Sequence, residues 1–426
     1  MKTKKNHKLL LLILSLKNLS RHRRRTIITA IAIAAGTAIY IATTSLIAGF
    51  SSESDRNLKE FELGNVGIFA MDYWAEKDQH PLDHMLENPQ ATLDALRAQD
   101  IPAVERLNFK GELIIHYDPF PEDGSIPMQF SAIDPQEDDQ VFHLKDTLIE
   151  GRWLEDGDEI LIGRWLADKI GAEVGYYVSV TTRTRDGFRQ LMDFQIVGIF
   201  ESFNPQIDRK VLYIPLDTAH MYLETGGAVN TIHALLPENQ PGTADVQPIR
   251  DILQEALPAE SQQIEVLSFA QMNEEMAALM QMSDTATGIL LFLLGIIAVV
   301  GVSNTMLMSV MERQKEIGTM RALGFRNGEI RQLFMLEAAG IGLIGAIGGL
   351  IIGAILVGLM VNVGIDYGFL LEDADMEFRL GNVLHGVWNT ADMLNVAIFA
   401  FLFSGLVALF PVRNMLGKQV TENLRQ

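Results

Sequence analysis

The sequence predicts an α-helical membrane protein with four transmembrane helices and a large α+β extracytoplasmic domain inserted between helices 1 and 2. Four uncharged apolar segments support this prediction, at residues 26–50, 285–311, 338–365 and 393–412. Each is about 20 residues or longer, which lets a helix cross a hydrocarbon core roughly 30 Å thick. Between the first two segments lies a long polar stretch, large enough for one or two compact domains.

Charge divides the chain into two compartments. The net charge is −20, yet no Asp or Glu precedes Glu53. Lys and Arg recur at 312–337 and 413–426, whereas 51–267 and 366–392 are rich in Asp and Glu. Because basic flanks stay in the cytoplasm, we expect a protein of the cytoplasmic (inner) membrane. Both termini would lie on its cytoplasmic side and the acidic segments on its outer side. Acidic residues far outnumber Lys and Arg in this domain. Phosphate contacts need Lys and Arg, so nucleic acid is not an expected partner.

The N-terminal region allows two interpretations. Residues 26–50 could be a cleaved signal peptide, but they exceed the apolar length of a typical signal core and no clear small-residue cleavage site follows. We therefore expect a retained helix. In the preceding cytoplasmic segment, 1–25, the run Leu9–Leu16 is too short to cross the membrane. Its flanking lysines, Lys8 and Lys17, favour an amphipathic helix along the inner interface.

The domain at 51–267 mixes strand-like and helix-like segments, which favours an α+β fold. The predicted strands, marked by β-branched or aromatic alternation, are Val66–Ala70, Glu112–His116, Met128–Ile133, Tyr176–Thr182 and Phe194–Phe200. The predicted helices are Pro89–Ala98, Arg164–Ile170, Pro215–Leu223 and Asp245–Ala256. The acidic, turn-rich stretch Asp134–Gln140 could separate two subdomains.

A stalk helix is predicted at 268–284, leading into the second span. Ser268 can cap it, and nothing breaks it before the span, so we expect one continuous rod. Its apolar residues at helical spacing include Phe269, Met272, Met276 and Met280. Two interpretations stay open for the methionines: ordinary packing against a neighbouring helix, or a flexible apolar surface for a greasy cargo.

Small residues form a stripe on two of the spans. They recur every fourth residue, at Ala30, Ala34 and Ala38 in the first span and at Gly345, Gly349 and Gly353 in the third. Such stripes let another helix approach closely. They predict helix packing, either within this chain or against a second subunit.

The loop at 312–337 is the candidate functional site. Its charged residues suit a helix that extends beyond the bilayer, Gly324 permits a left-handed helix end, and Asn327-Gly328 favours a turn. A helical hairpin of this kind can dock onto another protein. Charge alone is also explained by a solvated connector that obeys the positive-inside rule.

The chain lacks the sequence signals of an enzyme. It has no cysteine, which excludes disulfides, thiol catalysis and Cys-ligated zinc. HExxH, GxSxG and the GxxxxGK[ST] nucleotide loop are absent, and Gly417-Lys418 is followed by Gln. We therefore expect no catalytic residue and no cofactor in this chain. His80 and His84 could bind a metal, but Pro81 in a polar loop favours a solvated surface, so no metal site is predicted.

Several motifs together resemble the FtsX-like/MacB family of ABC-transporter permeases. The family's ER..EIG..RA.G pattern stands between an apolar span and a glycine-rich span, and is carried here by Glu312, Arg313, Glu316, Ile317, Gly318, Arg321, Ala322 and Gly324. The entry SLKNLSRHRRRTIITAIAIAAG and the ending FPVRNMLGKQVTENLR are similar to those of the family. The outer segment DEILIGRWLADKIGAEVGYYVSV also resembles a family pattern, but has Tyr176 where aspartate is usual.

The resemblance implies a dimer, formed with a second permease copy or a paralogue, and an ABC ATPase. Since the nucleotide loop is absent here, ATP and Mg would be bound by that partner. The resemblance implies that a coupling helix in the 312–337 loop seats on the ATPase, through Glu316, Gly318, Arg321, Ala322, Gly324, Phe325 and Glu329. It further implies mechanotransmission, in which nucleotide-driven closure inside moves the outer domains through rod-like helices.

The segment GNVGIFAMDYW, which follows the first span, resembles the lipoprotein-releasing LolC/LolE type. This implies extraction of lipoproteins or similar amphiphiles from the outer leaflet, with a periplasmic carrier as a further partner. Two alternatives stay open: drug or peptide efflux with a periplasmic adaptor, and transmembrane regulation of a cell-wall hydrolase.

Overall fold

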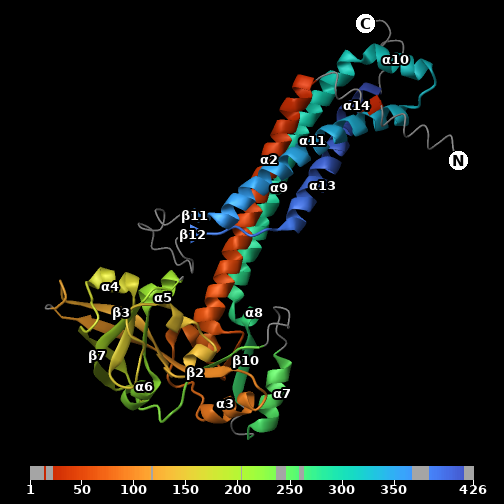
Figure 1. Ribbon diagram of the computed structural model, residues 1–426. Coiled ribbons are helices and arrows are strands. Elements are labelled where there is room, and N and C mark those ends of the chain that lie inside the picture. Colours follow the sequence, from red (N-terminus) through yellow and green to blue (C-terminus); the bar gives the residue numbers. More distant parts are fainter. Residues whose placement is uncertain are drawn as a thin grey trace. The chain divides into compact units, whose positions relative to one another are not determined.

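The computed structural model describes residues 14–15, 23–116, 119–202, 204–236, 246–258, 263–366 and 383–416 (Figure 1). These residues form two compact units. The helical unit takes in the described parts of Met1–Ser51, Leu279–Asp366 and Val383–Gln426, and the sheet domain is built from Ser52–Ala278. All but two residues of the predicted interfacial helix at Leu9–Leu16 lie outside the described residues.

Four helices in the described part of the chain are long and apolar enough to cross a membrane. They are α2 (Arg23–Leu58), α9 (Glu274–Glu312), α11 (Asn327–Asn362) and α13 (Thr390–Val407). The short helix α10 (Gln314–Ala322) lies between α9 and α11, α14 (Leu409–Leu416) follows α13, and β11 (Ile365–Asp366) pairs with β12 (Val383–Leu384). α2 and α9 extend past the predicted apolar segments at both ends. α11 and α13 begin before theirs but end at Asn362 and Val407, short of the predicted ends at 365 and 412.

Glycines allow the spans of the helical unit to approach closely. A Cβ atom added at Gly349 of α11 would lie 2.5 Å from Cβ of Thr37 on α2. Two turns earlier on α11, a Cβ added at Gly342 would lie 2.6 Å from Cβ of Ser404 on α13. Real Cβ atoms do not come this close to other atoms. The close packing of α2, α11 and α13 therefore requires glycine, which has no side chain, at these positions.

The sheet domain is built on a ten-stranded mixed sheet. Its order is β10-β1-β9-β2-β3-β8-β5-β7-β4, with β6 paired to both β2 and β7. The strands are β1 (Val66–Ala70), β2 (Ala103–Ile115), β3 (Gly124–Ile133), β4 (Leu148–Gly151), β5 (Glu159–Gly163), β6 (Tyr177–Arg183), β7 (Arg189–Phe200), β8 (Val211–Pro215), β9 (Thr231–Ala234) and β10 (Ile264–Ser268). The β3–β8 and β5–β7 pairs are parallel, and the remaining pairs among these strands are antiparallel.

Short helices and turns connect the strands. The α-helices are α3 (Pro89–Arg97), α4 (Arg164–Ile170), α5 (Pro205–Lys210), α6 (Leu216–Leu223), α7 (Gln247–Ala256) and α8 (Phe269–Met272). A π-helical turn, η1 (Lys59–Leu63), follows α2, and the 3₁₀ turns are η2 (Trp74–Gln79), η3 (Asp138–Gln140) and η4 (Leu144–Thr147). The α/β content agrees with the sequence prediction.

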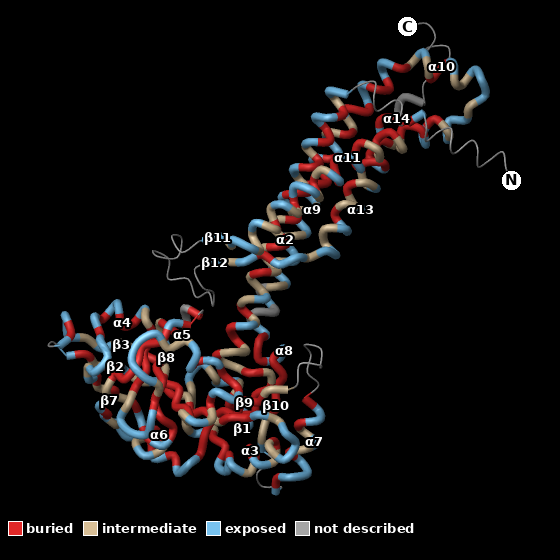
Figure 2. The backbone as a smooth tube through the Cα atoms, viewed as in Figure 1, coloured by how far each residue is buried: buried red, intermediate tan, exposed pale blue. Residues whose placement is uncertain are grey.

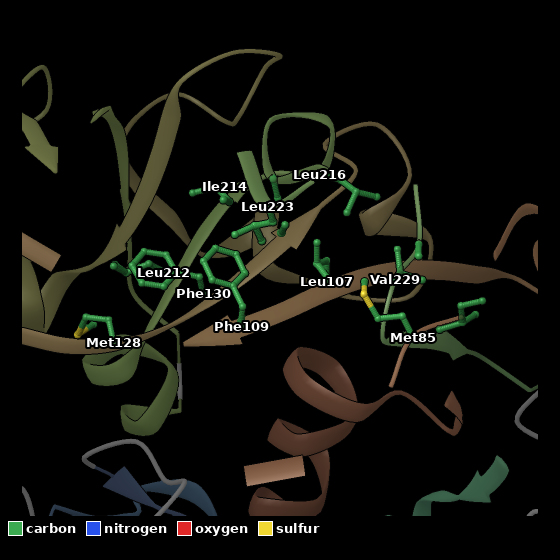
Figure 3. Packing of buried hydrophobic residues seen from close by; sticks show 14 of the residues in the cluster. Met85, Leu107, Phe109, Met128, Phe130, Leu212, Ile214, Leu216, Leu223 and Val229 are labelled. Carbon is green, nitrogen blue, oxygen red and sulfur yellow. The ribbon is translucent and has the colours of Figure 1, made fainter. Parts of the chain in front are cut away.

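Apolar side chains from neighbouring strands fill the interior of the sheet domain, where β1 and β9 are buried along their whole length (Figure 2). Phe109 of β2 stacks on Phe130 of β3, with ring centroids 5.1 Å apart (Figure 3). Leu212 and Ile214 of β8 belong to the same buried cluster. Fully buried aromatic pairs of this kind contribute large apolar areas to the core.

Two predictions about this domain need correction. The stretch Asp134–Gln140 does not separate subdomains, because the strands before and after it belong to one sheet and one compact unit. The predicted rod at 268–284 is interrupted at Asn273: Ser268 caps the short helix α8, and α9 begins only at Glu274. α8 lies beside β10 and β1 of the sheet domain. The side chain of Asn273 donates a hydrogen bond to Asp55, so these local contacts end α8 before α9 begins.

Candidate functional site

The predicted hairpin forms between the second and third spans. Its first helix, α10, ends at Ala322 and is followed by Gly324, whose φ of +94° lies in the left-handed region that favours glycine. The N–H of Gly324 donates to the carbonyl of Arg321 (3.1 Å), and the N–H of Phe325 donates to that of Met320 (3.0 Å). This pair of bonds is the Schellman arrangement that satisfies the last carbonyls of a helix.

The turn is tied to the first residues of α11. The carboxylate of Glu329 accepts a hydrogen bond from the N–H of Arg326 (2.8 Å), which caps α11. Across the turn, Nε of Arg321 donates to Oδ1 of Asn327 (3.1 Å). These bonds give the tip of the hairpin a defined shape.

A buried ionic network stands at the base of the hairpin. Arg313, at the break between α9 and α10, donates from Nη1 to Oε2 of Glu337 on α11 (3.1 Å) and from Nε to Oε2 of Glu316 on α10 (2.7 Å). Oγ of Ser309 on α9 donates to the other oxygen of Glu337 (3.4 Å). The Arg313 guanidinium also lies 5.5 Å from the centroid of the Phe334 ring. One arginine therefore connects α9, α10 and α11.

The hairpin brings the seven predicted coupling residues together but presents only some of them. Gly318 is buried and Glu316 is half-buried against Arg313, so these two stabilise the hairpin from within. The exposed members are Ala322 and Gly324, while Arg321, Phe325 and Glu329 are half-buried. Sequence reasoning missed Leu323, which is 74% exposed at the tip between them. Its large apolar side chain in a charged loop was the available signal.

The two small-residue stripes meet within one chain. A Cβ added at Gly345 would lie 3.0 Å from the carbonyl oxygen of Ala30, and one at Gly349 would lie 2.8 Å from that of Ala34. Gly353 faces Ile41 in the same way, since its Cβ would lie 2.9 Å from Cδ1 of that residue. The stripes therefore face each other, and Ala38 on the α2 stripe is likewise buried.

The proposed cargo-facing residues of the stalk are not on one open surface. Phe269 and Met272 are buried in the sheet domain, because α8 lies beside β1 and β10. Met280 is half-buried on α9, and the side chain of Met276 lies outside the described part of the structure. His80, expected on a solvated surface, is half-buried near the hydroxyl of Tyr73 (3.4 Å), and burial lowers its pKa to about 4.

Four apolar spans and a mixed sheet domain define a multi-pass membrane protein with a folded extramembrane domain. Comparison with known families is consistent with this description. Residues 26–252 match the MacB-like periplasmic core domain, and residues 288–420 match the FtsX-like permease C-terminal domain. The chain therefore belongs to the FtsX-like/MacB family of ABC-transporter permeases, whose members normally work with an ATPase.

Individual relatives point to more than one transport system. The chain is 26% identical over 65% of its length to an uncharacterised ABC transporter permease of Methanocaldococcus jannaschii, and covers 65% of that protein. It is 26% identical over 70% of its length to the lipoprotein-releasing system transmembrane protein LolC of Neisseria meningitidis, covering 73% of it. A 36% identical match to a probable export ATP-binding/permease protein MacB of Pseudomonas entomophila covers 24% of this chain and 15% of that protein.

Among solved structures, the periplasmic region of MacB from Actinobacillus actinomycetemcomitans is 12% identical to this chain. The match covers 52% of this chain and 96% of that structure, with a TM-score of 0.36.

Proposed function

We propose that the chain is the permease subunit of an ATP-driven machine that extracts lipoproteins or similar amphiphiles from the outer leaflet of the cytoplasmic membrane. The observation that carries this proposal is the similarity to LolC, which extends over 70% of this chain and 73% of that protein. An acyl chain held in a bilayer is stabilised by about 0.8 kcal/mol per buried CH₂, so extraction needs coupled energy.

The mechanism we propose is transmission of force along helices. α2 has 36 residues and α9 has 39, and neither is interrupted between its ends. A helix of that length measures on the order of 54–59 Å, more than the hydrocarbon thickness of a membrane. Each has one end in the helical unit and the other in the sheet domain. Both termini and the hairpin would face the cytoplasm, and the sheet domain would face the periplasm.

The ATPase partner would bind the tip of the hairpin. Leu323 is exposed there beside Ala322 and Gly324, and a compact apolar knob on a rigid turn suits a complementary socket. The Arg313 network would then pass a displacement of α10 directly to α9 and α11. A second permease copy or a paralogue would complete the complex, since a dimer is usual for the family.

Purification with the cognate ATPase tests the proposed cargo. ATP turnover should rise when a triacylated lipoprotein is added in lipid nanodiscs, and should not rise with the same lipoprotein lacking its acyl chains. Stimulation by a soluble drug, without stimulation by the lipoprotein, would instead support efflux with a periplasmic adaptor. The partial similarity to a probable export ATP-binding/permease protein MacB supports that second candidate. A Leu323→Asp variant should lose association with the ATPase.

A further inference from the structure

The last turn of the first membrane helix is held by donors from the sheet domain. After Leu58 the α-helix passes into the π-turn η1, and the carbonyls at a helix end lack partners within the helix. Three of these carbonyls accept hydrogen bonds from elsewhere: Glu60 from the N–H of His143 (3.0 Å), Phe61 from Nη1 of Arg106 (2.9 Å) and Leu63 from Nδ1 of His233 (2.9 Å). We call this set of contacts the helix socket.

Arg106 is the most tightly fixed donor of the socket. Its Nε and Nη2 donate to the two carboxylate oxygens of Asp138, each at 2.8 Å, and its side chain is 3% exposed. The guanidinium carbon lies 3.4 Å from the centroid of the Phe142 ring. Arg106 belongs to β2, which pairs with β3, β6 and β9, so its position is set by the centre of the sheet.

His233 contributes as a neutral ring. Burial and the neighbouring positive charge of Arg106 lower the pKa of His233 to about 3. With one ring proton at neutral pH, Nδ1 can donate it to the Leu63 carbonyl. The ring stands edge-on to Phe69 and Phe142, which fixes its orientation.

Further contacts tie the same turn to the segment that leaves the domain. The Glu62 carboxylate accepts from Nδ2 of Asn204 (2.7 Å). Nδ2 of Asn273 donates to Asp55 (2.9 Å), and the ammonium of Lys59 lies 4.5 Å from the Phe269 ring centroid. The segment that enters the sheet domain and the segment that leaves it therefore contact each other within that domain.

We propose that Arg106 is a positioning residue that locks η1, the turn that continues α2, into the sheet domain, so that this turn and the sheet move as one body. Stability alone does not explain this buried ion pair, because an apolar pair of similar volume often stabilises a fold equally well. An apolar pair cannot bind the Phe61 carbonyl, however. The lock is a property of the sheet domain, and only its consequence for transport rests on the proposed function.

The chain has no cysteine, so two spin labels can be placed without background. The full-length protein in nanodiscs would carry Ser52→Cys, exposed near the end of α2, and Lys110→Cys, exposed on β2. The test variant combines Arg106→Met with Asp138→Leu, which removes the donor and leaves no unpaired charge. Arg106→Lys keeps the charge beside Asp138 but loses the planar fork, and serves if the double variant does not fold. Arg185→Met with Glu87→Leu, an exposed pair away from η1, is the matched control.

Electron–electron distance measurement gives the direct readout. The wild-type labels and the control pair should give a narrow distribution, and the Arg106 variants should broaden it about twofold because the terminal turn opens locally. An unchanged width in a folded Arg106 variant would overturn the lock.

A transport measurement separates the lock from the proposed function. In the complex with the ATPase, the Arg106 variants should keep basal hydrolysis and lose stimulation by lipoprotein. Broadening with full stimulation would overturn the positioning role. Absence of stimulation in the wild type would instead contradict the proposed cargo, and leave the distance result as the measure of the lock.

Discussion

Arg313 and Glu337 form an ion pair at 3.1 Å although their side chains are only 10% and 6% exposed. The pair connects the end of α9 to the interior face of α11, at the base of the cytoplasmic hairpin of our proposal. Removing one member of a buried pair leaves an uncompensated charge, whereas removing both need not. The pair therefore offers a direct test of whether the hairpin is anchored there.

Glu337→Leu should destabilise the protein by about 3 kcal/mol, at the lower end for a broken buried pair because Glu316 still contacts Arg313. Arg313→Leu combined with Glu337→Leu should recover most of that loss. Thermal unfolding in detergent measures both. If the double variant is as unstable as the single one, the network does not anchor the hairpin as an ion pair.

Gly324→Pro should uncouple ATP hydrolysis from work while leaving membrane insertion intact. Proline fixes φ near −65°, so it cannot adopt the φ of +94° found at Gly324. It also has no N–H, so it cannot donate the hydrogen bond to the carbonyl of Arg321. Gly328→Ala is the control, because Gly328 has open space around a Cβ and no positive φ. The measurement is the coupling ratio of each variant in the reconstituted complex, that is, the amount of cargo released per ATP hydrolysed. Equal ratios would reject the role of the turn.

Gly349→Ala should destabilise the helical unit by about 1–3 kcal/mol, since overpacking forces helices apart. Its Cβ would lie 2.5 Å from Thr37, whereas the Cβ of Gly348→Ala would lie 3.4 Å from Ala34. The neighbouring substitution should therefore be close to neutral. Melting temperatures of the two variants provide the comparison, and a similar loss in both would argue against the observed packing of α11 on α2.

The stability of the sheet domain should fall as pH drops below about 6.5 through His233. The pKa of His233 is lowered from 6.5 to about 3 in the fold, so between these two pH values the unfolded chain binds one more proton than the folded chain. The free energy of unfolding therefore falls by about 1.4 kcal/mol for each pH unit below 6.5. Arg106 faces the ring and opposes its protonation. His233→Gln should be less stable at pH 7 but show a shallower pH slope between pH 4 and 6. Chemical unfolding at several pH values measures this, and parallel slopes would contradict it.

Length and hydropathy were sufficient to find the four spans, because an uncharged run of spanning length has few alternatives. The site was only partly predictable. Gly324 was found because a left-handed helix end favours glycine. Glu337 was taken as the edge of a loop, since its burial depends on Arg313, which comes from an earlier helix. A charge bordering a membrane span deserved a functional hypothesis in itself.

The sheet domain was harder to predict for a similar reason. β2 begins at Ala103, well before the predicted start at Glu112. Its first half was missed because the buried charge of Arg106 interrupts the apolar alternation that marks a strand. Its partner Asp138 lies in a turn distant in sequence and carries no local signal of pairing. Helix and strand patterns reveal which faces are buried, but they do not reveal which polar groups are buried together.

In the proposed topology, the hairpin lies on the side of the membrane where ATP is hydrolysed and the sheet domain lies on the opposite side. Thiol labelling tests this directly, because single cysteines can be placed at Leu323 and Phe188, which are 74% and 67% exposed. With a membrane-impermeant maleimide applied to spheroplasts, the Phe188→Cys variant should be labelled and the Leu323→Cys variant should react only after the membrane is permeabilised. Labelling of the Leu323→Cys variant in intact spheroplasts would contradict this topology.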